Sequence, residues 1–144
     1  MRIKDVLESK GAVGVVTIDP GATLAELIAT LTEHNFGALV VSEDGETLAG
    51  IVSERDIVRR LRDGADALQE RVSDVMTTEV HVCEPGDSLE DLMRMMTSRR
   101  VRHIPVVTDG KLAGLVSIGD AVKARIRELE FERDQLNQYV SGSQ

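Results

Sequence analysis

Apolar residues recur at helical spacing in two stretches of the chain, and the two stretches share one pattern. The predicted buried stripe consists of Leu24, Leu27, Ile28 and Leu31 in the first stretch and of Leu89, Leu92, Met93 and Met96 in the second. Thr23 with Glu26 forms a capping-box pattern before the first stretch, and Ser88 with Asp91 forms a looser version before the second. Two amphipathic helices with one buried face each are therefore expected.

Short β-branched stretches on both sides of these helices predict strands. The expected strands are residues 13–18, 37–42 and 47–52 in the first half and residues 80–83, 101–107 and 111–116 in the second. Asp-Gly pairs at 44–45 and 109–110 each lie between two apolar runs and indicate hairpins.

Further helices are expected at both ends of each half. An opening helix is expected over residues 3–9 and again over residues 72–76, the second capped by Ser73. A closing helix is expected from about residue 55 to 62 and from residue 119 onward. The order strand, helix, strand, strand, helix occurs twice, which predicts an α+β fold.

The doubled order of elements coincides with a repeat in the sequence itself. Residues 19–27 return as residues 84–92, and residues 48–56 return as residues 112–120. A period of roughly 65 residues suits a small domain that occurs twice better than a solenoid unit. Units of this size fold poorly alone, so the halves should bury a face against each other and leave a cleft between them. The predicted domains are residues 1–66 and 67–128, followed by a helical extension over residues 129–144.

The closing helix of the second half carries an apolar seam at heptad-like spacing. Its positions are Val122, Ile126, Leu129, Arg133, Leu136 and Val140, one of which is charged. A seam of this length is a weak coiled coil on its own, so it should pack on something. A partner subunit in a homodimer is the first interpretation, and a helix folded back on its own domain is the second.

Composition and charge narrow the functional classes. The net charge of −8 over 144 residues argues against binding to a nucleic-acid polymer, which needs a surplus of Lys and Arg. No apolar run approaches the length of a membrane span, and the N-terminus lacks the apolar core of a signal peptide. The single cysteine, Cys83, cannot form an internal disulfide, which fits a cytoplasmic protein. We therefore expect no membrane association.

Signals of enzymatic activity are missing from the sequence. It contains neither a Gly-x-x-x-x-Gly-Lys-Ser/Thr loop nor a Gly-x-Gly-x-x-Gly fingerprint. His34, His81 and His103 show no metal-ligand spacing. Cys83 is expected to be an inert thiol. No catalytic residue and no metal site are predicted.

The motif Gly-x-x-Ser-x-x-Asp occurs twice and is the main candidate for chemistry. Its polar members are Ser53 and Asp56 in the first half and Ser117 and Asp120 in the second, each pair between a strand and a helix. Such a junction offers unpaired backbone N–H groups to an anion, and an aspartate can accept from both hydroxyls of a ribose. The alternative is that these residues only cap their helices.

A second constellation precedes the hairpin of the second half. Arg100, Arg102 and His103 bring positive charge to the start of the predicted strand, and guanidinium groups suit phosphate. The matching positions of the first half include Gly37 and Ala38, which are small and apolar enough to lie against a purine ring. The alternative is a solvated start of a strand.

Residues 50–56, 114–120 and 102–107 resemble the motifs of paired CBS domains, the module named after cystathionine β-synthase. The resemblance extends from about residue 3 to residue 128. It implies two CBS-type β-α-β-β-α repeats packed as a pseudo-two-fold pair, with an extended C-terminal helix. It also implies a regulatory, signal-transducing module that senses energy or redox state. Such a module would bind AMP, ADP, ATP or NAD(H) between its domains without a metal, dimerise as a four-domain disk and modulate a partner that the sequence does not identify.

The resemblance also implies roles for individual residues. The aspartates Asp56 and Asp120 would hold ribose hydroxyls, and Ser53 and Ser117 would contact ribose or phosphate.

Other positions of the family pattern differ between the two halves. Arg102 and His103 match phosphate-binding positions, and Ala38 matches a position that lines the adenine slot. Pro105 is the usual proline of the pattern, whereas the first half has Val40 there. The first half also lacks a basic residue at Gly37 or Ala38, so one of the two sites is expected to be weak or empty.

Two other functions compete with nucleotide sensing. One is a dimeric interaction scaffold that binds no ligand and uses the terminal helix. The other is a nucleotide-processing enzyme, which the missing motifs disfavour.

Overall fold

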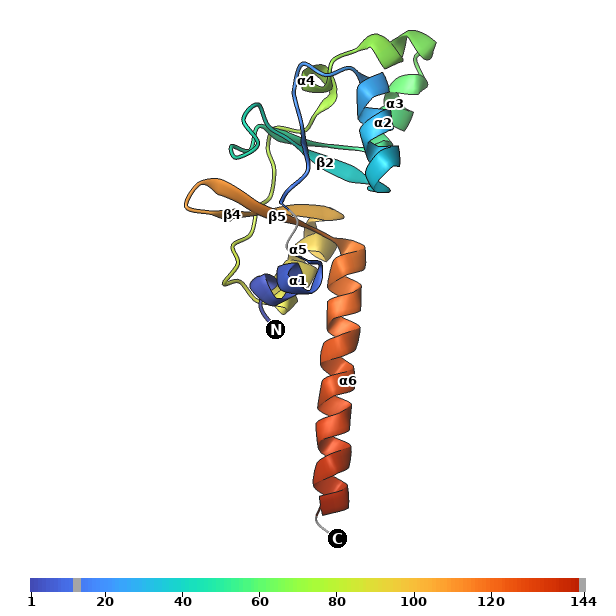
Figure 1. Ribbon diagram of the computed structural model, residues 1–144. Helices are drawn as coiled ribbons and strands as arrows, with labels where there is room; N and C mark the ends of the chain where they lie inside the picture. The colour runs from blue at the N-terminus through green and yellow to red at the C-terminus, as the bar shows by residue number, and fades with distance from the viewer. Residues whose placement is uncertain (12–13, 143–144) are drawn as a thin grey trace.

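The computed structural model describes residues 1–11 and 14–142, which form two lobes joined by extended segments (Figure 1). The first lobe has a three-stranded sheet of β1 (Thr17–Ile18), β2 (Ala38–Val41) and β3 (Gly50–Ser53). Strand β1 runs parallel to β2, which runs antiparallel to β3. The helices that the first half of the sequence contributes to this lobe are α2 (Leu24–His34), α3 (Glu54–Leu61) and the 3-10 helix η1 (Ala65–Gln69). The strand predicted over residues 13–18 is confirmed at residues 17–18, and residue 13 lies outside the described residues.

The second lobe repeats the helix and the hairpin. It contains α5 (Leu89–Arg99), the antiparallel pair β4 (His103–Thr108) and β5 (Lys111–Ser117), and α6 (Ile118–Gly142). Asp109 and Gly110 turn the hairpin with φ angles of 52° and 78°, as the Asp-Gly signal predicts. The strand expected over residues 80–83 is wrong: this segment makes a single parallel bridge, from Cys83 to Val106. The α+β class is confirmed.

The predicted starts and buried stripes of α2 and α5 are confirmed. The Thr23 hydroxyl accepts from the backbone N–H of Glu26 at 3.2 Å, and the Ser88 hydroxyl accepts from that of Asp91 at 3.1 Å. The stripe residues that are fully buried are Leu24, Leu27, Leu31, Leu89, Leu92 and Met96. Local spacing therefore placed the core face of each helix correctly.

The two opening helices exchange lobes. Helix α1 (Ile3–Ser9) contributes Ile3 and Val6 to the core that contains α5, β4 and β5. Helix α4 (Val72–Val75) contributes Val72 to the core that contains α2 and β3. Each half of the sequence thus completes the core of the other half. The predicted boundaries at residues 66 and 128 describe the order along the sequence, whereas the lobes in space are interwoven.

This exchange also decides where α4 begins. Ser73 is not the N-cap that the sequence predicted, since it lies inside α4 and Arg71 precedes the helix. The backbone N–H of Ser73 donates to the carbonyl of Pro20 at 2.9 Å instead. A backbone bond to the first lobe therefore replaces the expected side-chain cap.

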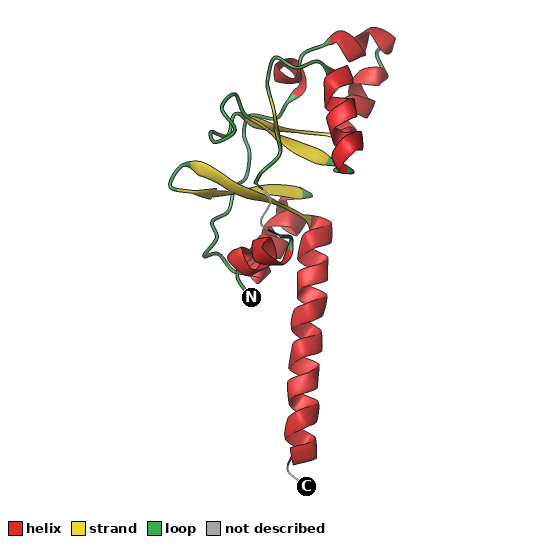
Figure 2. Ribbon diagram, viewed as in Figure 1, coloured by secondary structure: helices red, strands yellow, loops and turns green. Residues whose placement is uncertain are grey.

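The strands of the two lobes lie between the helices. Figure 2 shows α2 and α3 beyond the first sheet and α1 and α5 beyond the β4–β5 hairpin. The surfaces that face each other across the middle of the molecule are therefore formed by the strands and by the segments that connect the lobes.

Helix α6 starts on the second lobe and then projects from it (Figure 1). Ala121 and Ala124 are buried against the second core. The apolar seam lies on another face, with 50% of Ile126, 47% of Leu129 and 63% of Leu136 exposed. Within residues 1–11 and 14–142, no helix combines the length and the apolar character needed to cross a bilayer.

Candidate functional site

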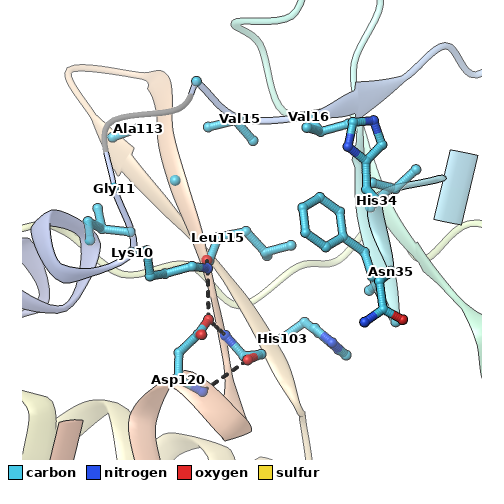
Figure 3. Close-up of a pocket in the computed structure, with 18 of the residues that line it drawn as sticks. Lys10, Gly11, Val15, Val16, His34, Asn35, His103, Ala113, Leu115 and Asp120 are labelled. Atoms are coloured by element: carbon cyan, nitrogen blue, oxygen red, sulfur yellow. Dashed lines mark hydrogen bonds and ion pairs between the residues drawn. The ribbon is translucent and has the colours of Figure 1, made fainter. Parts of the chain in front are cut away.

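A cleft of about 890 Å³ lies between the two lobes (Figure 3). Three parts of the chain line it: the end of α1 with the segment that follows, the turn from α2 into β2, and the β4–β5 hairpin with the start of α6. The lining residues are Leu7, Glu8, Lys10, Gly11, Gly14, Val15, Val16, His34, Asn35, Phe36, Gly37, Ala38, Leu39, His103, Ala113, Gly114, Leu115, Ser117 and Asp120. This volume is in the range of natural small-molecule sites.

Ser117 and Asp120 form the polar end of this cleft, at the junction of β5 and α6. The backbone N–H of Ser117 donates to the Asp120 carboxylate at 2.9 Å, and the backbone N–H of Asp120 donates to the Ser117 hydroxyl at 3.1 Å. This reciprocal pair is a capping box, so helix formation itself fixes the carboxylate. The Lys10 ammonium group donates to the same carboxylate at 2.8 Å. The predicted capping role and a position in the cleft therefore coincide.

The surroundings of Asp120 keep its carboxylate charged. Partial burial raises the pKa of Asp120. The bonds from Lys10 and from the backbone of Ser117 outweigh that effect and hold the pKa below its usual value. The side chain is still 21% exposed. A negatively charged acceptor thus faces the cleft at neutral pH.

His103 stands beside this carboxylate and remains neutral. It opposes Ser117 in the β4–β5 ladder. Burial lowers the pKa of His103, and the nearby Asp120 and Glu54 carboxylates only partly oppose that effect. Its Nε2 lies 3.6 Å from the point that a Cβ on Gly37 would occupy, so the two lobes meet closely here. A neutral imidazole at this point can donate one hydrogen bond and accept one.

The opposite side of the cleft comes from the first lobe and is largely apolar. Figure 3 shows Val15, Val16 and His34 across the cleft from Lys10 and Asp120. The backbone after α2 continues this side. It turns at Asn35, whose φ of 55° lies in the left-handed region.

Phe36 adds an aromatic surface to this side. Its ring stacks on that of His34 with centroids 5.3 Å apart and planes 17° from parallel. Phe36 remains 42% exposed, whereas Ala38 is 1% exposed at the base of this wall. The result is a flat apolar surface facing a charged carboxylate.

The first copy of the motif lies elsewhere. The Asp56 carboxylate accepts from the backbone N–H of Ser53 at 2.8 Å and from the Ser53 hydroxyl at 3.2 Å. Both residues are half-buried at the start of α3, and neither lines the cleft. Here the side-chain bonds of Ser53 and Asp56 are those of a helix cap.

The glycines of the two motifs serve the packing of the opening helices. A Cβ on Gly114 would lie 2.6 Å from Cδ2 of Leu7 in α1. A Cβ on Gly50 would lie 2.7 Å from the carbonyl oxygen of Thr77, just after α4. Each glycine therefore lets the opening helix of the other half approach its strand.

Of the predicted basic cluster, only His103 lines this cleft, and the two arginines do not. Arg100 ends α5 with a φ of 55° instead of starting a strand, so its predicted place in the strand is wrong. Arg102 precedes β4, and its carbonyl accepts from Ile118 N–H at 2.8 Å. Pro105 is buried within β4 opposite Leu115.

Half of the predicted site residues meet in the cleft. Those that line it are Gly37, Ala38, His103, Ser117 and Asp120, and those outside it are Ser53, Asp56, Arg100, Arg102 and Pro105.

Sequence reasoning missed other lining residues. Lys10 follows α1, and no local pattern connects it with Asp120, because the exchange of the opening helices brings them together. Phe36 carried a weak signal as an aromatic residue beside Gly37 in a chain with 2% aromatic residues.

The Cys83 thiol lies outside this cleft. Burial, with a contribution from Asp87, raises the pKa of the Cys83 thiol to about 12, so it stays protonated. Within residues 1–11 and 14–142, no three His, Cys, Asp or Glu side chains group as metal ligands would.

Comparison with known proteins identifies the family to which this fold and this doubled motif belong. A sequence model of the CBS domain matches residues 3–63 and again residues 72–127. The chain belongs to the CBS-domain family and contains two CBS domains.

Individual relatives agree with this assignment. The chain is 38% identical to the mitochondrial CBS domain-containing protein CBSX3 of Arabidopsis thaliana, over 97% of this chain and 72% of that protein. The crystal structure of the CBS-domain containing protein ATU1752 from Agrobacterium tumefaciens is 43% identical, with a TM-score of 0.82 over 87% of this chain and 99% of that one. CBSX2, solved in complex with AMP, is 25% identical, with a TM-score of 0.73 over 88% of this chain and 96% of its own.

Proposed function

We propose that this chain is a regulatory module that binds an adenosine nucleotide, of the AMP, ADP, ATP or NAD(H) class, in the cleft between its two lobes. The observation that carries the proposal is the geometry of Asp120. Its charged, half-buried carboxylate is fixed by a helix cap and opens into a cleft whose opposite wall is apolar and aromatic. A ribose attached to a flat base matches that combination.

Each part of the ligand has a counterpart in the cleft. The ribose hydroxyls would donate to the Asp120 carboxylate, with the Ser117 hydroxyl beside it, as acidic residues do in dinucleotide folds. The base would lie against Ala38 and the Phe36 ring, where aromatic stacking adds to burial. His103, being neutral, would supply one polar contact near the sugar.

Two further observations support this ligand class. CBSX2, which has the same fold and 25% identity, was solved in complex with AMP. The wall opposite Asp120 is formed by the first lobe, so one ligand would contact both lobes at once. A ligand of this kind shifts an equilibrium only by its differential affinity for the two arrangements. We infer that the response to the nucleotide is a change in how the lobes or subunits pack, read by a separate protein.

Titration calorimetry and thermal unfolding with AMP, ADP, ATP and NADH test this proposal. A ligand at 100 times its Kd stabilises the folded state by about 2.7 kcal/mol. For a chain of this size that corresponds to a rise in Tm of roughly 5–10 °C. No heat and no rise in Tm with any of the four would refute nucleotide binding. Product formation during incubation with ATP or NADH would instead favour the enzyme interpretation.

The exposed seam of α6 favours an additional interaction role, and we propose that a second copy of this chain covers it. Lys123 and Arg125 flank the start of the seam, whereas Glu130 and Glu132 flank the next turns. Opposite charges meet when two such helices run antiparallel.

A further inference from the structure

The cleft contains an ion pair that its capping box does not need. Lys10 ends α1. Its ammonium group reaches Asp120 Oδ2 at 2.8 Å and the carbonyl oxygen of Leu115 at 2.7 Å (Figure 3). The Asp120 carboxylate is already held by the backbone of Ser117. Both bonds go to Oδ2, so Lys10 occupies part of the acceptor capacity that the carboxylate could offer to a ligand.

Among the described residues that line the cleft, Lys10 carries the permanent positive charge. The other charged lining groups are the carboxylates of Glu8 and Asp120. His103 is held neutral by burial. The arginines that the sequence predicted for phosphate, Arg100 and Arg102, lie outside the lining. Recognition of an anion in this cleft thus falls to Lys10.

We infer that Lys10 makes the cleft selective for phosphorylated nucleosides by exchanging partners. In the structure its ammonium group neutralises Asp120. When ribose hydroxyls donate to that carboxylate, the ammonium group moves to the phosphate of the same ligand. This inference rests on the proposed function and adds to it the requirement for a phosphate group.

The geometry makes this exchange feasible. The Lys10 side chain is 40% exposed and Asp120 is 21% exposed, and partly solvated ion pairs of this kind are weak. Lysine carries its charge on a flexible four-carbon chain with three donors, so the ammonium group can turn to a new acceptor without movement of α1. After the exchange both charges are paired again, the carboxylate with hydroxyls and the ammonium group with phosphate.

An unphosphorylated nucleoside can make only one of the two new contacts. Its hydroxyls can donate to the Asp120 carboxylate, but no phosphate is present to pair with the Lys10 ammonium group in the partly desolvated cleft. The intact Lys10–Asp120 pair should therefore oppose the binding of adenosine but not that of AMP. Replacing Lys10 by an apolar residue should weaken the binding of AMP and leave the binding of adenosine unchanged or tighter.

The experiment compares AMP with adenosine by calorimetry on the full chain and on three variants. Lys10→Met removes the charge, Lys10→Arg keeps it, and Lys4→Met is the control, because Lys4 is exposed on α1 outside the cleft. We expect the wild type to bind AMP about tenfold or more tightly than adenosine, since a charge-assisted hydrogen bond is worth about that factor. Lys10→Met should collapse this ratio toward one, while Lys10→Arg and Lys4→Met should retain it.

The outcomes separate this inference from the proposed function. If the wild type binds AMP and Lys10→Met leaves the ratio of AMP to adenosine affinity unchanged, Lys10 does not recognise the phosphate, although the nucleotide site stands. If the wild type binds neither AMP nor adenosine, the inference fails, and the proposed function fails with it only when ADP, ATP and NADH also give no heat. Should Lys10→Met fold poorly in a melting scan, Lys10→Gln takes its place with the same expectation, and an unchanged ratio there overturns the inference equally.

Discussion

The two aspartates of the repeated motif provide a matched pair for testing the site. Asp56 and Asp120 hold equivalent positions, each accepting from the backbone N–H of the serine three residues earlier, at 2.8 Å and 2.9 Å. Only Asp120 lines the cleft. Asp120→Asn should therefore weaken nucleotide binding, whereas Asp56→Asn should affect stability alone.

The magnitudes follow from the contacts that each substitution removes. Loss of a capping carboxylate costs about 0.5–2 kcal/mol of unfolding free energy, and both variants should show it. Asp120→Asn also breaks the half-exposed pair with Lys10, which adds about 0–1 kcal/mol. For affinity, a hydroxyl bonded to a charged acceptor contributes about 1.5–3 kcal/mol. Asp120→Asn should thus lower the affinity for AMP roughly ten- to hundredfold.

Calorimetry with AMP and chemical unfolding of the wild type and both variants measure the two effects separately. We expect the binding loss in Asp120→Asn only, with unfolding free energies of the two variants within about 1 kcal/mol of each other. Equal losses of AMP affinity in both variants would refute the reasoning, because the cleft would then not distinguish the two motifs. Unchanged affinity in Asp120→Asn would remove the ribose contact from the site.

Other consequences of the structure can be measured independently of one another. Gly50→Ala should lower the unfolding free energy by about 1–3 kcal/mol, because its Cβ meets backbone. Gly114→Ala should lower the unfolding free energy by less, because the Leu7 side chain that its Cβ meets can move aside. A larger loss for Gly114→Ala than for Gly50→Ala in urea unfolding would contradict these contacts. Since the folded pKa of His103 is depressed, the unfolded chain takes up its proton first. Stability should therefore fall as the pH drops below about 6.5. In His103→Gln, the loss of unfolding free energy between pH 7.0 and pH 5.5 should be smaller than in the wild type. An equal loss in both proteins would exclude His103 as its cause. Ending the chain at residue 128 should halve the mass measured by light scattering, with or without AMP, and an unchanged mass would place the subunit contact elsewhere.

Local features of this protein were readable from its sequence because neighbouring residues encode them. The stripe from Leu24 to Leu31, the cap at Thr23 and the Asp109-Gly110 turn each depend on residues within one or two helical turns or a single hairpin. The doubled order of these features gave the α+β class and the resemblance to CBS domains. The error at Arg100 was also local, since a left-handed helix end replaced the first residues of the predicted strand.

The candidate site was only half predictable, because the two motifs are nearly alike in sequence and differ in their surroundings. Ser53 and Asp56 make the same capping contacts as Ser117 and Asp120, so no local pattern distinguishes them. The difference arises from what the rest of the chain brings to each junction. At Asp120 that is Lys10, more than a hundred residues away in the sequence.

The sequence by itself determined most of the elements, their repetition and residues that can cap a helix and accept from a sugar. Tertiary structure decided which opening helix completes which core, and hence which aspartate faces a cleft and which cation stands beside it. The physical reason is that hydrogen bonds within a turn are set by adjacent residues, whereas burial of an apolar helix face is satisfied by any complementary surface within reach of the chain. Here that surface belongs to the other half.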